Sequence, residues 1–498
     1  MSRANDASAG ARTAAPAVLG AEESLHAEAL EQRVRQLAAA LRGAEPTPKM
    51  LGIVADNGPD WLLVDLACER LGLPIVPLPA FFTAGQMRHA VEATGMDALL
   101  CSAPAVALAL GFAPGPALPG VALPWFRREA APVPLPAGTS KITFTSGTTG
   151  QPKGVCLSRE HQRRVAGSLV DATRGLGIER HLSLLPLAVL LENVAGLYAP
   201  LMAGATCCLP PLSEVGVGGS SSFDPNACLK AIARWQAHSV IVLPQMLLAL
   251  TAALEAGAPP PVHLRFVAVG GAKVAPALLA RARDVGLPAY EGYGLSECAS
   301  VVALNVPGAD RPGSVGRPLP HARVIVDGSR EILVEGPRFL GYLGAPTRDD
   351  AGLHTGDLGH IDTDGFLTID GRRKHQLITA FGRNVAPEWP EAELTASPVI
   401  AQAAVFGEAK PHLCAVIVPG AREVNDAAVA AAIAVANDRL PDYAQIAGWI
   451  RADAPFSAAD GTATTNGRVV RDAVWARYAA RLEKTYQHPN GVVTDALL

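Results

Sequence analysis

The chain lacks the cysteine patterns of a zinc or disulfide-stabilised protein. Its 498 residues contain eight cysteines, with no C-x-x-C pair and no His/Cys cluster at zinc spacing. Cysteines scattered in this way are typical of reduced, mostly buried thiols. We therefore expect a cytoplasmic protein that is stabilised by an apolar core.

Two further absences narrow the function. The net charge of −4 gives no basic field for nucleic acid, so no nucleic-acid partner is expected. The most apolar run, 182–209, is interrupted by Pro186, Glu192, Asn193 and Pro200, whereas a membrane span needs about 20 uninterrupted apolar residues. No transmembrane segment is expected, and peripheral contact with a membrane surface stays open.

Length and composition predict a well-packed protein of two or more domains. Hydrophobic residues make up 49% and charged residues 18% of a chain too long for a single core. Residues 1–22 are rich in Ala, Ser and Gly and lack the apolar core of a secretory signal. They are predicted to form a flexible N-terminal extension.

The order of predicted elements indicates an α/β fold. Helices over 23–41, 60–71, 86–94, 226–237, 245–256 and 275–285 alternate with strands over 50–55, 74–78, 98–102, 239–243 and 265–269. Such alternation predicts parallel sheets flanked by helices. After residue 313 short strands and turns take over, and the last part contains helices over 388–396 and 424–438 with strands over 401–406 and 412–418. We predict a large, multi-subdomain N-terminal domain over 23–371 and a small α+β domain over 372–498.

The segment TFTSGTTGQPKG, residues 143–154, carries the most chemical information. It contains three glycines, five hydroxyl side chains and one lysine, Lys153. Glycines let the backbone approach an anion closely, and amide N–H groups, hydroxyls and a lysine bind phosphate oxygens. Pro152 precedes the lysine, so the spacing differs from that of a nucleotide-hydrolase P-loop. The segment predicts a phosphate-binding loop, the alternative being a polar surface turn.

Two later segments have residues suited to the rest of a nucleotide. In YEGYGLSE, residues 290–297, an aromatic ring between glycines can lie against a purine and the acid can hold magnesium. In HTGD, residues 354–357, a carboxylate beside a glycine can accept hydrogen bonds from ribose hydroxyls. The alternatives are a strand-end turn with an incidental tyrosine and an Asp-capped turn.

Taken in order, these motifs resemble those of the adenylate-forming superfamily of acyl-CoA synthetases, luciferases and peptide-synthetase adenylation domains. The resemblance runs from about residue 20 to 477. Within the superfamily, YEGYGLSEC, the PGSVGRPLPH segment over 312–321, and GRRKHQLIT followed by GRNVAPEWPE are most similar to medium- and long-chain fatty acyl-CoA synthetases. The resemblance implies ATP, Mg²⁺ and coenzyme A as cofactors and a mobile C-terminal domain.

The resemblance also implies residue roles. Tyr293 would stack on adenine, Ser296 would contact the α-phosphate, Asp357 and Arg372 would bind the ribose, and Glu297 would bind magnesium. The implied cofactor-binding positions are Thr145, Ser146, Gly147, Thr148, Thr149, Gly150, Lys153, Gly271, Ala272, Tyr293, Gly294, Ser296, Asp357, Arg372 and Gly382. The implied catalytic positions are Arg468, Glu297, Thr145 and Lys374, and the implied metal ligands are Glu297 and Thr145. Lys374 would be the hinge between two poses of the C-terminal domain, the alternative being a surface lysine in a basic run.

Two positions depart from the family pattern. Val189 stands where long-chain enzymes usually carry a histidine or an aromatic residue, which leaves the shape of the acyl pocket open. Arg468 stands where the family has a lysine that stabilises charge between the carboxylate and the α-phosphate. Arginine is also a permanent cation, but it is larger and planar. We expect a working enzyme with altered geometry, the alternative being a catalytically impaired nucleotide-binding protein.

The expected reaction is the AMP-forming activation of a fatty carboxylic acid and its transfer to coenzyme A. Three alternatives remain open: a ligase that loads the phosphopantetheine of an acyl carrier protein, an aryl-acid CoA ligase, and an impaired homologue. No residue acts as a covalent nucleophile in this scheme, because catalysis rests on positioning and charge stabilisation.

Overall fold

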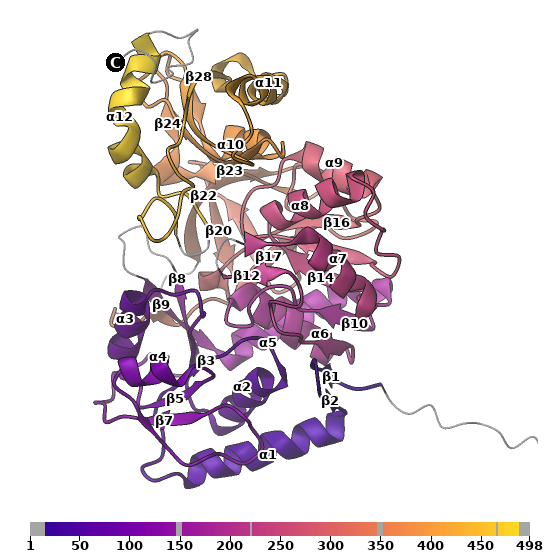
Figure 1. Cartoon of the computed structure of the whole chain (residues 1–498), viewed down its shortest axis with the longest axis vertical. Helices are drawn as coiled ribbons and strands as arrows, with labels where there is room; N and C mark the ends of the chain where they lie inside the picture. Colours follow the sequence, from indigo (N-terminus) through magenta and orange to yellow (C-terminus); the bar gives the residue numbers. More distant parts are fainter. Residues whose placement is uncertain (1–14, 146–151, 220–221, 346–351, 465–466, 488–498) are drawn as a thin grey trace, which may run out of the picture.

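The computed structural model describes residues 15–145, 152–219, 222–345, 352–464 and 467–487. Two large sheets with flanking helices make up the N-terminal part, and smaller sheets follow (Figure 1). The elements after β23 form a separate lobe at one end of the molecule, with α1 at the opposite end (Figure 1). The α/β class predicted from the sequence is confirmed.

The first large sheet has eight strands in the order β21-β9-β8-β4-β3-β5-β7-β6. Its central strands, β5, β3, β4 and β8, are parallel, and every residue of β3 and β5 is buried. Continuous apolar runs suit such strands because both faces of the sheet are covered. The strands are β3 (Leu51–Val54), β4 (Ile75–Pro77), β5 (Ala98–Cys101), β6 (Ala113–Pro114), β7 (Trp125–Arg127), β8 (Thr139–Thr145), β9 (Lys153–Ser158) and β21 (Gly341–Tyr342), and the associated helices are α1 (Ala27–Gly43), α2 (Pro59–Leu71), α3 (Ala84–Thr94) and α4 (Pro104–Ala109).

The second large sheet has nine strands in the order β18-β17-β16-β15-β14-β10-β11-β1-β2. The run from β16 to β1 is parallel, and its apolar side chains pack against α7, α8 and α9 on one face. Its strands are β1 (Val18–Leu19), β2 (Ser24–Leu25), β10 (Arg180–Leu182), β11 (Thr206–Cys208), β14 (Ser239–Val242), β15 (Phe266–Val269), β16 (Ala289–Leu295), β17 (Ser300–Leu304) and β18 (Arg317–Pro318). Its helices are α5 (Arg159–Thr173), α6 (Ala199–Met202), α7 (Pro225–Arg234), α8 (Pro244–Glu255) and α9 (Pro276–Asp284), together with a π-helix, η2 (Glu192–Tyr198).

Four smaller sheets complete the described part of the chain, two of which are strand pairs: β12 (Val217–Gly218) with β13 (Ser222–Phe223), and β24 (Leu377–Ile378) with β25 (Asn384–Val385). An antiparallel four-stranded sheet contains β19 (Arg323–Val326), β20 (Glu331–Glu335), β22 (Leu353–Ile361) and β23 (Leu367–Arg372). The three-stranded sheet contains β26 (Ile400–Phe406), β27 (Leu413–Pro419) and β28 (Ile446–Arg451), accompanied by α10 (Glu388–Thr395), α11 (Asp426–Asn437) and α12 (Arg471–Gln487). Two apolar clusters form the core around the three-stranded sheet, and Ala396, next to α10, packs into the core of the second large sheet. The predicted boundary between residues 371 and 372 falls at the end of β23 and stays a prediction.

The N-terminal prediction needs a correction. Val18 and Leu19 form β1, which pairs with Cys207 and Cys208 of β11, and Val18 is fully buried. A parallel strand pair with a buried valine cannot belong to a flexible extension, so the predicted extension over 1–22 is too long at its C-terminal end. Among the described helices, none has both the length and the apolar character that crossing a membrane requires.

A buried polar network joins the two large sheets. Lys141 of β8 lies 2.8 Å from the Asp65 carboxylate of α2 and contacts the side chains of Asn193 and Tyr198 in η2. The Tyr198 hydroxyl donates to the same carboxylate at 2.5 Å. Lys141 and Asp65 are only 3% and 1% exposed, so their charges depend on each other. The network fixes the strand that leads into the phosphate loop against the π-helix of the second sheet.

We expect Lys141→Ala to destabilise the protein strongly, because it leaves the Asp65 carboxylate buried without its cation. Removing one partner of such a pair costs about 3–5 kcal/mol of unfolding free energy, and the measurement is the urea midpoint followed by circular dichroism. Arg174→Ala is the control, since the Arg174–Asp171 pair is exposed and should contribute less than about 1 kcal/mol. Equal midpoints for the two variants would contradict the role given to the network.

Candidate active site

The hairpin of β8 and β9 carries the predicted phosphate loop. Thr145 ends β8 and pairs with Lys153, the first residue of β9. The predicted loop positions between them, Ser146, Gly147, Thr148, Thr149 and Gly150, lie outside the described residues. The Lys153 Nζ lies 5.6 Å from the centre of the Tyr342 ring, within cation–π range. Both ends of the hairpin line a large cleft.

Tyr293, Asp357 and Arg372 meet on one wall of this cleft. The Tyr293 hydroxyl donates to Asp357 Oδ2 at 2.6 Å, and Arg372 Nε lies 2.7 Å from Asp357 Oδ1. Burial raises the pKa of Asp357, while Arg372 and the tyrosine hydrogen bond oppose this rise. The antiparallel pairing of β22 with β23, with Asp357 opposite Arg372, brings the last two residues together. The predicted ribose pair and the predicted adenine-stacking residue are therefore adjacent.

Glu297 also lines the cleft. It belongs to a short 3₁₀ turn, η3 (Ser296–Cys298), directly after β16, and its Oε1 accepts a hydrogen bond from the Tyr342 hydroxyl at 2.8 Å. Ser296 and Glu297 both line the cleft, as does Thr145. A carboxylate and a hydroxyl are the hard oxygen ligands that Mg²⁺ prefers. The side chains present thus fit the predicted magnesium site.

Glycine is required at two of the predicted positions. A Cβ on Gly294 would lie 2.0 Å from the carbonyl oxygen of Ser300, because β16 and β17 are closely paired there. Gly271 has a φ of +91°, which L side chains rarely adopt. Ala272 follows Gly271 in the same turn and also lines the cleft. The turn leaves backbone groups facing the cleft.

Arg468 reaches this turn from the C-terminal part of the chain. Its Nη2 donates to the carbonyl oxygen of Gly271 at 2.8 Å. Desolvation in the cleft and the nearby Arg372 lower the pKa of Arg468, whereas the carboxylates of Asp357 and Glu297 raise it. The guanidinium therefore lies within electrostatic range of the predicted ribose and magnesium ligands.

Lys374 and Gly382 are placed differently. Lys374 lies in a 3₁₀ turn, η4 (Arg373–His375), at the cleft. Desolvation of its amine lowers its pKa, together with Arg372 and Lys153, and Asp472 opposes the shift. Gly382 has a φ of +70° in the loop between β24 (Leu377–Ile378) and β25 (Asn384–Val385), and it does not line the cleft among the described residues. The structure thus brings Lys374 to the site and leaves Gly382 outside it.

The cleft also has an apolar branch. The whole cleft has a volume of about 3430 Å³, which exceeds the 300–1,000 Å³ of an ordinary small-molecule pocket. Val189 and Leu191 line it beside the turn that contains Gly270, and a Cβ on Gly270 would lie 3.5 Å from the Leu191 side chain. The cleft has room for a nucleotide and an apolar acid together.

Two residues that support the site, Tyr342 and Glu291, were not predicted from the sequence. Tyr342 of β21 donates a hydrogen bond to Glu297 of η3, a contact between residues 45 apart that no local spacing indicates. Glu291 accepts a hydrogen bond from the Val274 amide at 3.2 Å and supports the turn that carries Gly271. Burial raises the pKa of Glu291 to about 8, with Lys273 opposing the shift. A glutamate between two strand residues gave no sign of this supporting role.

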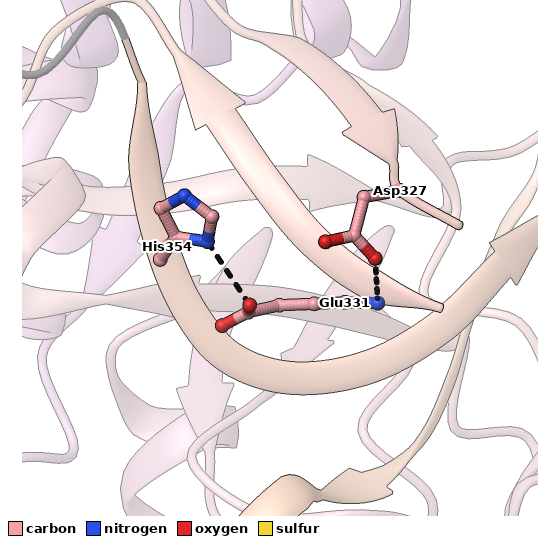
Figure 2. Close-up of side chains that lie close together, drawn as sticks. All are labelled: Asp327, Glu331 and His354. Atoms are coloured by element: carbon pink, nitrogen blue, oxygen red, sulfur yellow. Dashed lines mark hydrogen bonds and ion pairs between the residues drawn. The ribbon is translucent and has the colours of Figure 1, made fainter. Parts of the chain in front are cut away.

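Asp327, Glu331 and His354 form a second cluster of possible metal-ligand types (Figure 2). Glu331 accepts hydrogen bonds from His354 Nδ1 and the Gly356 amide, each at 3.0 Å, and Arg373 lies 3.0 Å from it. Asp327 caps its own turn through the Glu331 amide at 2.9 Å (Figure 2). These oxygens already have donors and an adjacent guanidinium, so the cluster is a structural link between β20, β22 and the 3₁₀ turn η4.

Family models match nearly the whole chain. The model described as AMP-binding enzyme matches residues 5–342, and that described as AMP-binding enzyme C-terminal domain matches residues 374–490. The chain belongs to the AMP-binding enzyme family. The adenylate-forming superfamily inferred from the motifs is confirmed.

Individual AMP-binding enzymes differ in their substrates. A feruloyl-CoA synthase of Amycolatopsis sp. is 29% identical over 409 residues, covering 77% of this chain and 80% of that protein. A long-chain-fatty-acid–CoA ligase of Mycobacterium bovis is 33% identical over 321 residues, covering 55% and 53%. The solved structure of an O-succinylbenzoate coenzyme A synthetase from Bacillus subtilis, in complex with ATP and magnesium ion, aligns with a TM-score of 0.71 at 21% identity, covering 92% of this chain and 96% of that one.

Proposed function

We propose that this protein is an AMP-forming acid–thiol ligase. It activates a hydrophobic carboxylic acid with ATP, releases pyrophosphate, and transfers the acyl group from the adenylate to coenzyme A, its co-substrate. The observation that carries the proposal is the contact of Arg468 with Gly271, at a cleft also lined by Glu297, Asp357 and Lys153. This contact brings the Arg468 cation from the C-terminal part of the chain to the side chains that would bind an adenylate.

The residue roles follow from this arrangement. Thr145 and Glu297 would hold Mg²⁺, which neutralises charge on the phosphate oxygens. Asp357 and Arg372 would orient the ribose, and Tyr293, already fixed by Asp357, would lie against the adenine. Lys153 and Arg468 would stabilise charge that develops around the α-phosphate.

In this proposal, catalysis depends on side chains held in fixed positions and not on a covalent intermediate with the protein. The donors are held before the substrate arrives, so little reorganisation is needed during the reaction. Lys374, beside Arg372 and Lys153, is proposed as the hinge, and Gly382 as a contact of the thiol arm in a second pose of the C-terminal part. The acceptor most favoured is coenzyme A, with the phosphopantetheine of a carrier protein as the alternative.

The acid is proposed to be a medium- or long-chain fatty acid or an aryl acid. The apolar branch, lined by Val189, Leu191 and Met246, suits either chemistry. Relatives named for fatty and for aryl acids support both. Val189 leaves more room than the histidine or aromatic side chain expected there, which favours an acid that is broad near its carboxylate.

The purified protein should form AMP and pyrophosphate only when a suitable acid is present. The measurement is pyrophosphate release over a panel of fatty and aryl acids, with and without coenzyme A. Coenzyme A should raise the turnover by releasing the bound adenylate. Formation of ADP and phosphate would contradict the proposal.

Glu297→Gln should lower turnover by orders of magnitude, because it keeps the size of the side chain but removes a charged magnesium ligand. The melting temperature should stay near that of the wild type. Glu335→Gln, which changes a carboxylate paired with the exposed Arg323, is the matched control and should keep full activity. Wild-type turnover in Glu297→Gln at low magnesium would show that the ligand lies elsewhere.

Arg468→Ala should slow adenylate formation by about 10²–10³-fold, the usual effect of losing one charge-stabilising contact. Thioester formation from synthetic acyl-adenylate should change much less, and Arg468→Lys should retain substantial activity. Arg422→Ala, at an exposed arginine of the same part of the chain, is the control. Unchanged adenylation in Arg468→Ala would contradict the catalytic role, and a wild type that is inactive until Arg468 becomes Lys would identify an impaired homologue.

A further inference from the structure

Two hydrogen bonds join the C-terminal part of the chain to residues 271–281 of the N-terminal part. At the start of this segment the Gly271 carbonyl accepts from Arg468. Near its end, Arg281 Nη1 of α9 donates to the carbonyl oxygen of Ala396 at 2.8 Å. Ala396 directly follows α10 and belongs to the apolar core of the second large sheet, and in Figure 1 the lobe that contains α10 lies next to α9. Two separate attachment points restrict the orientation of the C-terminal part more than one contact could.

The Ala396 carbonyl is a group that needs a donor from outside its helix. The last carbonyl groups of a helix have no intrahelical partner, and Ala396 is only 4% exposed. A guanidinium suits this place, because a charged donor makes a strong hydrogen bond and the C-terminal end of a helix attracts cations. The end of α10 is therefore satisfied by a side chain of the N-terminal part.

Glu255 of α8 holds Arg281 in the orientation that this contact requires. Its Oε1 and Oε2 accept from Arg281 Nε and Nη2 at 2.9 Å and 2.7 Å, so that Nη1 is left for Ala396. The same hydrogen bonds raise the pKa of Arg281 and lower the pKa of Glu255. Because both groups stay charged and the guanidinium is held on two sides, little side-chain freedom is lost when α10 docks.

A second cation of the same segment acts on α10. Lys273 Nζ donates to the Ile369 carbonyl at 2.9 Å. Desolvation lowers the pKa of Lys273, and nearby carboxylates that include Glu388 and Glu393 of α10 oppose the shift. The helix therefore approaches the N-terminal part with two carboxylates and its C-terminal end, while the N-terminal part offers Lys273 and Arg281. The charges of the two parts are complementary.

We propose that Arg281, oriented by Glu255, is a positioning residue for adenylate formation, which docks the end of α10 so that Arg468 stays at Gly271. This inference rests on the proposed ligase function and deepens it. Arg281 and Ala396 lie on opposite sides of the proposed hinge at Lys374, so rotation of the C-terminal part about that hinge breaks their contact. A contact made in only one of two poses shifts the population towards that pose. Arg281 thus favours the pose that forms the adenylate.

Arg281→Ala should slow one half-reaction and spare the other. With the acid that gives the highest turnover, single-turnover pyrophosphate release should fall by about three- to tenfold, the effect of losing one hydrogen bond of this kind. Thioester formation from the synthetic adenylate of that acid and coenzyme A should not fall, because the rotated pose lacks the contact. An equal decline in both half-reactions would indicate general destabilisation and overturn the proposal, as would unchanged pyrophosphate release.

Arg283→Ala is the matched control. Arg283 lies two residues further along α9, and its side chain is 27% exposed, against 32% for Arg281. It pairs with Asp310 and donates to the Ala289 carbonyl, both in the N-terminal part. Its loss removes a comparable set of contacts without affecting α10, so both half-reactions should keep the wild-type rates. The same selective loss of adenylate formation in Arg283→Ala would overturn the assignment to Arg281.

Glu255→Ala tests the orienting role of the carboxylate. Arg281 keeps its charge in this variant but loses the two hydrogen bonds that orient it. Pyrophosphate release should fall by a smaller factor than in Arg281→Ala, with thioester formation again unchanged. Wild-type pyrophosphate release would overturn the role given to Glu255.

The pose can also be measured without turnover. The eight native cysteines are buried, so spin labels can be attached at Val262→Cys in the N-terminal part and Val435→Cys in α11, two positions that are exposed in the wild type. By double electron–electron resonance, the ratio of molecules at the distance given by this structure to all others should fall in Arg281→Ala by the same three- to tenfold factor. Arg283→Ala should keep the wild-type ratio, and an unchanged ratio in Arg281→Ala would overturn the proposal.

The two proposals fail differently. Absence of AMP formation with every acid would contradict the ligase function, while the distance distributions would still decide whether Arg281 holds the C-terminal part. An active ligase in which Arg281→Ala changes neither the half-reactions nor the distances would contradict the positioning role alone.

Discussion

The position of β8 relative to the second sheet depends on one buried ion pair. Lys141 and Asp65 are both nearly inaccessible, so neither charge is stable without the other. Asn193 and Tyr198 of η2 complete the network. Since β8 leads directly into the predicted phosphate loop and Ala195 of η2 lines the cleft, this pair links the site proposed for the phosphates to the site proposed for the acid.

The π-helical form of η2 explains how one short segment serves two sheets. Glu192 and Asn193 are consecutive, yet Glu192 contacts His181 of the second sheet while Asn193 contacts Lys141 of the first. The segment is also where the apolar run 182–209 is interrupted by polar residues. Glu192 and Asn193, which argued against a membrane span, link the π-helix to both large sheets.

The elements predicted correctly from the sequence are those that depend on local sequence signals. The helix over 60–71 appears as α2, with Pro59 in its first turn and Gly72 in a left-handed conformation at its end. Strand β1 was not predicted, since it pairs with β11, far along the chain. Strands β2 and β28 and helix α12 were not predicted either. Likewise the family resemblance indicated Glu297 and Asp357, but their contacts with Tyr342 and Tyr293 span 45 and 64 residues and depend on how separate sheets pack together.

The contact of Arg468 with a backbone carbonyl offers a physical reason for arginine at a position where lysine is expected. A lysine ammonium at this position would be a single point charge, whereas the planar guanidinium can donate to the Gly271 carbonyl and still present other N–H groups to an incoming phosphate or carboxylate. Gly467 precedes it with a φ of +75°, and the Thr464 hydroxyl accepts from the Arg468 amide at 3.1 Å, which orients the backbone at Arg468.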